Sequence, residues 1–426
     1  MGKESERAEW KRVLLVGVDT GEEQDFEHSM EELASLAEAD CRQVVGIVVQ
    51  HMATVNQALY IGKGKAAEVK EYAAQTEAEE VVFDNALSPS QMRNLGKELE
   101  LPVSDRNNLI LDIFALRAKT REAKLQVESA RLQYMLPRLV GMRQNLSRQG
   151  GTGGSMSNRG AGETKLELDR RKIEYRISEL KKELEAVARN RETMRKKRGQ
   201  SGVLQAALVG YTNAGKSTIM NRLVEKYGES REKTVLEKDM LFATLDTSVR
   251  SICAGNGKPF LLADTVGFIH KLPHGLVQAF RSTLEEVKYA DLLIQVVDFS
   301  DEHFKQQIEV TEATLKELGA GDIPRIVVYN KADKCCQEEI PRRVGNQIYM
   351  AAGTGCGLEE LMEMVQDTLY AGRVEADFLL PFDRGDLVSY FRENAFVEAQ
   401  EYGEEGVRMR VSCHRGDAEK YGAYRV

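Results

Sequence analysis

The stretch VLQAALVGYTNAGKSTIMNRL, residues 203–223, decides the fold of the largest predicted domain. It carries the pattern G-x-x-x-x-G-K-S at 210–217, between the apolar run QAALV and the helix-forming run TIMNRLVEKY. A strand, a glycine-containing turn and a helix in this order form the loop that surrounds nucleotide phosphates, because backbone N–H groups at the start of the helix point at the anion. The stretch therefore predicts an α/β domain that binds a nucleoside triphosphate.

Two side chains of this loop have predicted roles of their own. We expect Lys216 to reach the β and γ oxygens and Ser217 to ligate Mg²⁺. The phosphate-binding residues that we predict here are Gly210, Tyr211, Thr212, Asn213, Ala214, Gly215, Lys216, Ser217 and Thr218.

Two later motifs favour GTP over ATP. The strand-like run PFLLADTVGF leads into Asp264, Thr265, Val266 and Gly267, where the carboxylate can reach Mg²⁺ through water and the Gly267 N–H can contact a γ-phosphate. The run RIVVYNKAD then ends in Asn330, Lys331, Ala332 and Asp333. A carboxylate at the last position can accept both guanine N1–H and the 2-amino group, whereas adenine offers neither donor in that arrangement.

Two further segments complete the predicted site. Thr244 is our candidate for a switch threonine on Mg²⁺ and the γ-phosphate, although its position also suits an ordinary threonine at the start of a strand. Its flanking candidates are Phe242, Ala243, Leu245 and Asp246. Backbone groups of Ala351, Ala352 and Gly353 are expected at the base.

The expected metal ligands are Ser217, Thr244 and, through water, Asp264, and the residues expected to act on the γ-phosphate are Lys216, Thr244 and Gly267. Many GTPases of this type carry a water-orienting Gln where this chain has Phe268. Phe cannot polarise water, so we expect it to pack and intrinsic hydrolysis to be slow.

Composition sets the frame around these motifs. The chain has 426 residues, 42% of them hydrophobic and 30% charged, which is typical of a protein of two to four globular domains. It has no apolar run long enough to span a membrane and no secretory signal pattern at its start. Its six cysteines include no C-x-x-C pair, so a disulfide framework or a zinc site is disfavoured and a reducing cytoplasm is favoured.

The first hundred residues alternate apolar runs with helix-like runs. The apolar runs lie at 12–18, 44–50 and 80–85. This alternation predicts a small parallel α/β domain.

From about residue 109 the apolar period becomes seven, which predicts two helices that fold back as an antiparallel hairpin. The seven-residue seam consists of Leu125, Leu132, Leu139 and Leu146 in the first helix, and Leu166, Ile173, Leu180, Val187 and Met194 in the second. A Gly-rich loop is expected between them at 149–164.

The charge is concentrated in this hairpin. Residues 116–198 hold 22 Lys and Arg against 10 Asp and Glu, whereas the whole chain has a net charge of −8. A basic segment in an acidic protein favours contact with a polyanion such as RNA, although a solvated helix face is the plainer alternative.

The tail from about 372 reads as strand, helix, strand, strand, which predicts a small α+β domain. The predicted domains are an N-terminal parallel α/β domain at 1–108, a basic helical hairpin with a Gly-rich loop at 109–200, a P-loop GTPase domain at 201–371, and the C-terminal domain at 372–426.

These motifs together resemble the HflX family of translational GTPases. The resemblance rests on FATLDT, DTVGF, N-K-x-D, YIGKGK at 60–65 and the signature GAGETKLELDRR at 160–171, and covers roughly residues 10–371. It implies a Ras-like G domain behind the α/β domain and the hairpin. It also implies a cytoplasmic GTPase that binds the large ribosomal subunit and its rRNA and, with GTP, splits stalled or idle ribosomes. It permits weak ATP binding in the N-terminal domain.

Two other functions stay open on the residues alone. One is a protein that uses GTP only as a conformational switch in a signalling or membrane complex. The other is a P-loop ATPase that remodels RNA.

Overall fold

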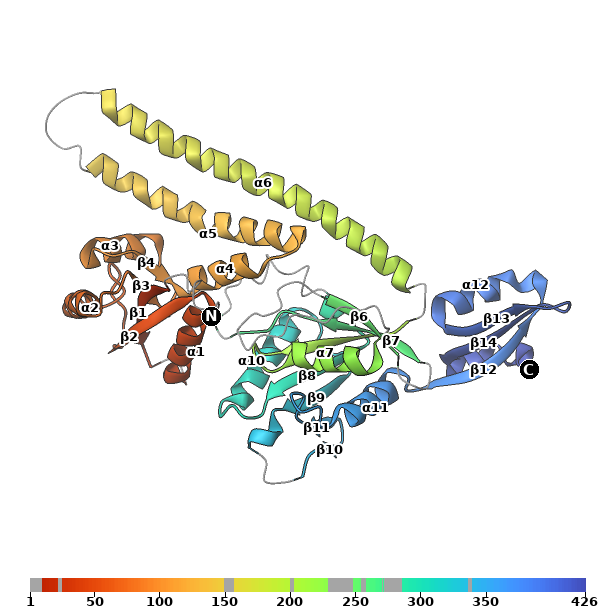
Figure 1. Ribbon diagram of the computed structural model, residues 1–426. Helices are drawn as coiled ribbons and strands as arrows, with labels where there is room; N and C mark the ends of the chain where they lie inside the picture. Colours follow the sequence, from red (N-terminus) through yellow and green to blue (C-terminus); the bar gives the residue numbers. More distant parts are fainter. Residues whose placement is uncertain are drawn as a thin grey trace, which may run out of the picture. The chain divides into compact units, whose positions relative to one another are not determined.

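The computed structural model describes residues 10–21, 25–148, 157–199, 203–228, 248–253, 258–269, 271, 286–335 and 339–426, with side chains omitted at 139–148, 157–166, 192 and 194–199 (Figure 1). The chain divides into two compact units. The first contains the N-terminal residues through Leu184 together with Lys271, and the second contains Glu185 and most of the remaining chain through Val426.

The first unit is built on a parallel sheet in the order β2-β1-β3-β4. Its strands are β1 (Lys11–Asp19), β2 (Arg42–His51), β3 (Glu80–Phe83) and β4 (Val103–Asp105), and its helices are α1 (Phe26–Ala39), α2 (Lys63–Gln75), α3 (Pro89–Leu99) and α4 (Arg106–Arg117). Parallel neighbours need a crossover, and the helices supply it. The core includes Leu14, Val16, Val81 and Phe83, which are fully buried.

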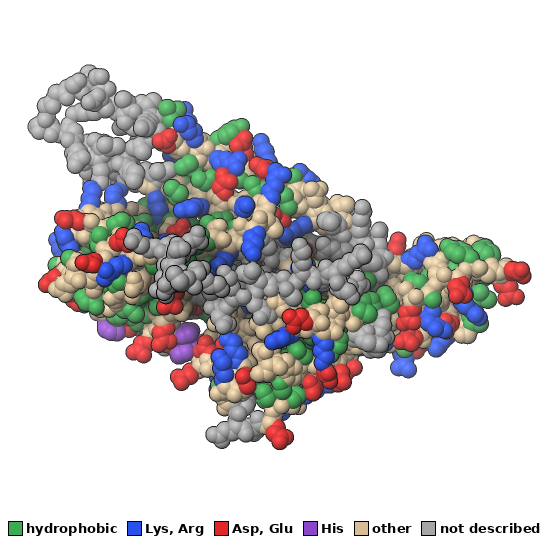
Figure 2. All heavy atoms as spheres, viewed as in Figure 1, with side chains coloured by type: hydrophobic (Ala, Val, Ile, Leu, Met, Phe, Trp, Pro, Cys, Tyr) green, Lys and Arg blue, Asp and Glu red, His purple; other side chains and the backbone are tan. Residues whose placement is uncertain are grey.

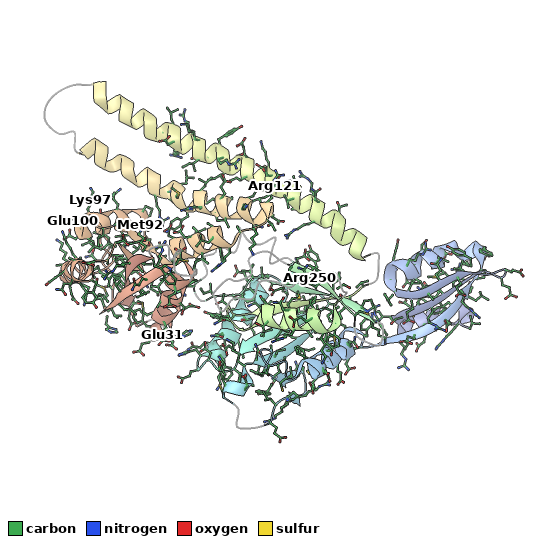
Figure 3. The ribbon with its side chains drawn as sticks, viewed as in Figure 1. Glu31, Met92, Lys97, Glu100, Arg121 and Arg250 are labelled. Atoms are coloured by element: carbon green, nitrogen blue, oxygen red, sulfur yellow. The ribbon has the colours of Figure 1, made fainter. Side chains whose placement is uncertain are left out.

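The helical hairpin consists of α5 (Arg121–Arg148) and α6 (Ser157–Gly199) (Figure 1). Two ion pairs join the helices: Arg121 to Glu183 at 3.0 Å and Arg176 to Glu128 at 2.7 Å. The partner of the earlier residue in α5 comes later in α6, so the helices run antiparallel. Arg121 is labelled at the start of α5 in Figure 3.

The predicted seam is present where side chains are described. Leu125 and Leu180 are buried, and Leu132, Ile173 and Val187 are half-buried. The remaining predicted seam residues lie outside the described side chains: Leu139, Leu146, Leu166 and Met194.

The loop of the hairpin differs from the expectation. It was expected to extend to residue 164, but α6 begins at Ser157 and includes Gly160 and Gly162. Each glycine costs a helix about 1 kcal/mol relative to alanine. A helix of 43 residues offsets this cost, because propagation adds one hydrogen bond for each residue fixed.

Polar contacts attach α5 to the N-terminal sheet. The hydroxyl of Tyr134 donates to Asp105 at 2.7 Å, and Arg138 donates to the same carboxylate and to the Leu87 carbonyl, both at 3.3 Å. Burial and the Asp105 carboxylate raise the pKa of Tyr134. This attachment could not be predicted from the sequence, because neither Tyr134 nor Arg138 lies on the seven-residue seam.

The second unit is built on a seven-stranded sheet in the order β10-β11-β9-β8-β5-β7-β6. Its strands are β5 (Gln205–Gly210), β6 (Ser248–Cys253), β7 (Pro259–Asp264), β8 (Leu292–Asp298), β9 (Arg325–Asn330), β10 (Arg342–Val344) and β11 (Gln347–Tyr349). The five inner strands are parallel, and β6 and β10 are antiparallel edges. Its helices are α7 (Lys216–Tyr227), α10 (Phe304–Glu317) and α11 (Leu358–Leu369).

The tail forms the small α+β domain that the sequence predicts. Strands β12 (Arg373–Leu380), β13 (Phe396–Tyr402) and β14 (Val407–His414) form an antiparallel sheet with β14 in the centre. Helices α12 (Gly385–Asn394) and α13 (Arg415–Lys420) complete it. Phe378 and Phe391 stack in its core with centroids 4.6 Å apart.

The predicted fold class is therefore confirmed: a parallel α/β domain, a helical hairpin, a P-loop α/β domain and a small α+β domain. The domain boundaries at 108, 200 and 371 stay predictions. Within the described residues, no helix is long and apolar enough to cross a membrane.

Candidate nucleotide-binding site

The phosphate loop joins β5 to α7 at the carboxyl end of β5, which lies between β8 and β7 in the sheet. Gly210 has φ +140°, and a Cβ there would overlap the carbonyl oxygen of Val296. Gly215 has φ +96°, and a Cβ there would overlap the side-chain nitrogen of Asn330. Both positions exclude any residue with a side chain, and this explains why the motif needs these two glycines.

Lys216 begins α7 and is nearly buried, with 6% of its surface exposed. Its ammonium donates to the carbonyl oxygens of Gly210 at 3.0 Å and Tyr211 at 2.6 Å. Burial lowers the pKa of Lys216 to about 8, and the carboxylate of Asp264 only partly opposes this effect. A cation held by neutral carbonyls in a dry site would gain strongly from an added anion.

Ser217 and Asp264 form the candidate magnesium site. The Ser217 hydroxyl donates to Asp264 Oδ2 at 2.9 Å, and Asp264 is fully buried at the end of β7. Mg²⁺ prefers hard oxygen ligands and takes few of them from the protein, with phosphate and water supplying the rest. The pair fits that need. In the described part of the chain, no group of three or more His, Cys, Asp or Glu side chains could hold a metal by itself.

The segment after β7 lies against the phosphate loop. The Phe268 N–H donates to Gly210 O at 3.1 Å, and the Thr212 N–H donates to Phe268 O at 2.8 Å. A Cβ on Gly267 would lie 3.0 Å from the Lys216 ammonium nitrogen. Phe268 is 2% exposed, so it packs as predicted. Thr265 donates to Leu208 O at 2.6 Å, and Val266 is buried.

The loop after β9, which is predicted to contact the base, is held by Asn330. Its amide nitrogen donates to Ala214 O at 2.9 Å, and its amide oxygen accepts from the Ala352 N–H at 2.9 Å. One side chain therefore connects the phosphate loop to the segment Ala351–Gly353. The sequence predicted these three segments as one site, and the structure brings them together.

Lys331 and Asp333 complete the loop. Lys331 adopts φ +60° and its ammonium donates to Asn213 O at 2.9 Å and to Asp298 at 2.7 Å. Ala332 is buried, whereas Asp333 is exposed. An exposed residue at this position suits the predicted role, in which the carboxylate accepts hydrogen bonds from a guanine base.

Two residues that support the site were missed from the sequence. Asp298, at the end of β8, fixes Lys331, and Arg222 of α7 donates to the Gly353 carbonyl at 2.9 Å. The signal for Asp298 was its place after an apolar strand, at the edge where the carboxyl ends of parallel strands meet. The predicted residues Phe242, Ala243, Thr244, Leu245 and Asp246 lie outside the described residues.

The Gly-Lys motif of the N-terminal domain has a different environment. The Gly62 N–H donates to Gln50 at 3.0 Å, and Lys65 pairs with Glu68 at 2.8 Å at the start of α2. One of its two lysines, Lys65, thus already has a carboxylate partner. ATP binding in this domain stays a prediction.

Three family models match consecutive parts of the chain. One described as "GTP-binding GTPase N-terminal" matches residues 27–115, and one described as "GTP-binding GTPase Middle Region" matches residues 117–198. One described as "50S ribosome-binding GTPase" matches residues 205–331.

Curated relatives match nearly the whole chain. A protein from Lacrimispora saccharolytica named "GTPase HflX" is 43% identical over 399 residues, covering 93% of this chain and 92% of its own length. The protein of the same name from Escherichia coli is 38% identical and covers 94% of both chains. Among solved structures, the one titled "crystal structure of SsGBP and GDP complex" is 26% identical, with a TM-score of 0.47, over 84% of this chain and 98% of that chain.

Proposed function

Because this chain belongs to the HflX family of GTPases and hydrolyses GTP, we propose that it binds the large ribosomal subunit and splits or recycles stalled or idle ribosomes. GTP binding and hydrolysis would drive this cycle in the cytoplasm. The match to this family favours the proposal over the two alternatives considered above, a signalling switch and an RNA-remodelling ATPase.

The observation that carries the proposal is the basic hairpin connected to a GTPase domain. Residues 116–198 hold an excess of 12 positive charges, and Lys and Arg side chains recur along the described part of the hairpin (Figure 2). Phosphate contacts of such side chains supply most of the affinity of many proteins for nucleic acid. The family model that matches the GTPase domain is described as ribosome-binding, which supports ribosomal RNA as the polyanion.

In the proposed mechanism, the carboxylate of Asp333 selects guanine, and Lys216 and the Gly267 N–H hold the γ-phosphate. Ser217 and Thr244 would ligate Mg²⁺ directly and Asp264 through water; the ion would neutralise charge on the phosphates. Backbone groups of the phosphate loop, of residues 242–246 and of Ala351–Gly353 would surround the rest of the nucleotide.

Lys216 already donates two of its three ammonium hydrogens to carbonyls, so it can contact both the β and the γ oxygens only if at least one of those bonds is replaced. A Cβ on Gly267 would lie 3.0 Å from the same ammonium nitrogen, so the Gly267 N–H and Lys216 are near enough to contact one γ-phosphate. Phe268 cannot orient water, and intrinsic hydrolysis is slow for that reason. Contact with the ribosome would orient the attacking water that Phe268 cannot orient.

The first test is co-sedimentation with large subunits and with whole ribosomes, with GDP and with a non-hydrolysable GTP analogue. We expect the analogue to increase binding and to release free subunits from whole ribosomes. Equal recovery with both nucleotides and no free subunits would contradict the proposal and favour a switch in another complex.

A variant with neutralised cations tests whether the basic hairpin contacts RNA or is only a solvated helix face. Replacing Arg195, Lys196, Lys197 and Arg198 with Gln should weaken subunit binding and flatten its salt dependence, with a slope lower by up to about 3 to 4 counterions. Intrinsic GTP hydrolysis should not change. The matched control replaces four exposed cations of the C-terminal domain: Arg392, Arg408, Arg415 and Lys420. An unchanged slope in the hairpin variant would favour the solvated face.

A further inference from the structure

One face of α6 exposes two large apolar side chains. Leu168 is 50% exposed and Tyr175 is 67% exposed. They are seven residues apart and therefore lie on the same side of the helix. The opposite side carries Ile173 and Leu180, which pack toward the interior of the hairpin. Tyr175 consequently makes no contribution to the seam.

Three cations share this side of the helix with Tyr175. Arg171 and Lys172, one helical turn before it, have side chains that are 71% and 77% exposed. Lys182, seven residues after Tyr175, is also exposed. We call Leu168, Arg171, Lys172, Tyr175 and Lys182 the outer face.

Three acidic residues lie near the outer face, and two of them hold its cations only weakly. Glu167 lies 3.4 Å from Arg171 and Asp169 lies 3.6 Å from Lys172, and both are intrahelical pairs at the surface. Such pairs are worth about 0.5 kcal/mol or less and yield readily to a phosphate. Glu179 shares the side of Tyr175 but is engaged by Arg176, at 3.6 Å. The cations of the outer face are therefore held only by weak surface pairs, which the phosphates of a polyanion can replace.

An exposed aromatic ring among cations has a specific chemical complement. Single-stranded RNA presents flat unstacked bases beside phosphates, so a ring can stack on a base while neighbouring cations contact the backbone. A protein partner that covered an apolar patch would require a broader apolar area with fewer charges. Charge complementarity thus favours RNA.

We propose that Tyr175 stacks on an unpaired base of ribosomal RNA, while Arg171 and Lys172 contact the flanking phosphates. This inference rests on the proposed function, because it names the element of the hairpin that meets the RNA and the kind of RNA structure it requires. The flat ring makes the contact, and the hydroxyl is not needed.

The test measures binding to isolated large subunits in the presence of the GTP analogue, for Tyr175→Ala and Tyr175→Phe. Loss of a stacked base weakens binding by about 5- to 100-fold. We expect that loss for Tyr175→Ala and nearly full affinity for Tyr175→Phe. Tyr402→Ala, at a tyrosine 70% exposed in the C-terminal domain, is the matched control and should bind as the unaltered protein does. Tyr175 is exposed and alanine favours helix, so these variants should fold, which thermal unfolding verifies.

The salt dependence distinguishes stacking from charge. Tyr175→Ala should lower affinity without changing the salt slope, because no charge is removed. Arg171→Gln with Lys172→Gln should lower the slope by up to about 1.4 to 1.8. Chemical probing of the RNA should show one or a few nucleotides that the unaltered protein and Tyr175→Phe protect and Tyr175→Ala does not.

The outcomes separate this inference from the proposed function. If the unaltered protein binds subunits and Tyr175→Ala binds equally well, stacking is refuted and the proposed function stands. Crosslinking to ribosomal proteins tests the other partner. If Tyr175→Ala abolishes a crosslink to a ribosomal protein and leaves the protection of the RNA unchanged, the partner of the outer face is a protein and the inference is wrong. If the unaltered protein does not bind subunits at all, the proposed function itself fails.

Discussion

The two units bury charge in opposite ways. In the nucleotide site, Lys216 is buried against carbonyl oxygens, and burial lowers its pKa to about 8. In the N-terminal domain, Arg106 is 1% exposed but pairs with the carboxylates of Asp84, at 2.6 Å, and Glu32. The first cation is incompletely neutralised and the second is matched by acids.

The N-terminal cluster extends beyond this pair. Asp84 also accepts from Lys271 at 2.6 Å and from Ser29 at 2.9 Å. Burial raises the pKa of Asp84, but Arg106 and Lys271 outweigh burial and hold it below its ordinary value. Lys271 belongs to the same compact unit although it is distant in sequence. Folding itself satisfies these charges.

The contrast teaches how to separate a ligand site from a structural cluster. A buried ion that already has its counter-ions gains little from a ligand, whereas one that lacks a close counter-ion gains much. The same criterion distinguishes the Gly-Lys motif of the N-terminal domain from the phosphate loop. Lys65 is paired with Glu68, whereas the attraction of Asp264 only partly offsets the effect of burial on Lys216. The following predictions test this contrast.

The largest effect is expected at Lys216. Lys216→Ala removes the cation that faces the β and γ oxygens, and GTP affinity should fall by about a thousandfold or more, as for loss of a buried charged partner. The measurement is a direct titration with a fluorescent GTP analogue. Lys65→Ala is the control and should leave this affinity unchanged.

The next effect concerns stability in the N-terminal domain. Arg106→Met leaves buried carboxylates without their cation and should lower the free energy of unfolding by about 3 to 5 kcal/mol. Urea unfolding measures the loss. The GTP affinity of the remaining folded protein should be unchanged, and a fall in it would mean that the cluster is not purely structural. If Arg106→Met is too unstable to purify, Ser29→Ala should cost about 1 to 3 kcal/mol, because it removes the hydrogen bond to Asp84 and the hydroxyl that accepts from Lys271 and Arg106.

The sequence predicted the nucleotide site far better than this cluster. The phosphate loop, Asp264 and Asn330 belong to short motifs whose spacing is dictated by a ligand of fixed shape. The fold class also followed from two apolar patterns: the alternation of apolar and helix-like runs in the first hundred residues and the period of seven in the hairpin. Arg106, Asp84 and Glu32 carry no spacing rule, because their proximity arises only when α1, β3 and α4 pack together. Tyr134 was missed for the same reason. Polar side chains whose partners are distant parts of the same chain produce no short sequence motif.

The smallest effect is a pH dependence of nucleotide binding. The free protein holds Lys216 with a pKa of about 8, lowered from its ordinary value by burial. Phosphates stabilise the ammonium, so the pKa is higher in the complex. Above pH 8 the free lysine is increasingly neutral and must take up a proton when GTP binds, so affinity falls as pH rises. Below pH 7 the lysine is charged in both states, and this dependence vanishes.

A single lysine of this pKa predicts a loss of about threefold in GTP affinity between pH 7.5 and pH 8.5. Calorimetry in two buffers of different ionisation enthalpy should also show net proton uptake at pH 8.5. The control is Asp333→Asn, which leaves Lys216 in place and should keep the same pH dependence for the nucleotide it still binds. Affinity that does not vary across this range, with no proton uptake, would show that Lys216 is fully charged before GTP arrives. Lys216 and Arg106 would then both be charged in the folded protein without ligand. They would differ only in their partners, which are carbonyl oxygens for Lys216 and carboxylates for Arg106.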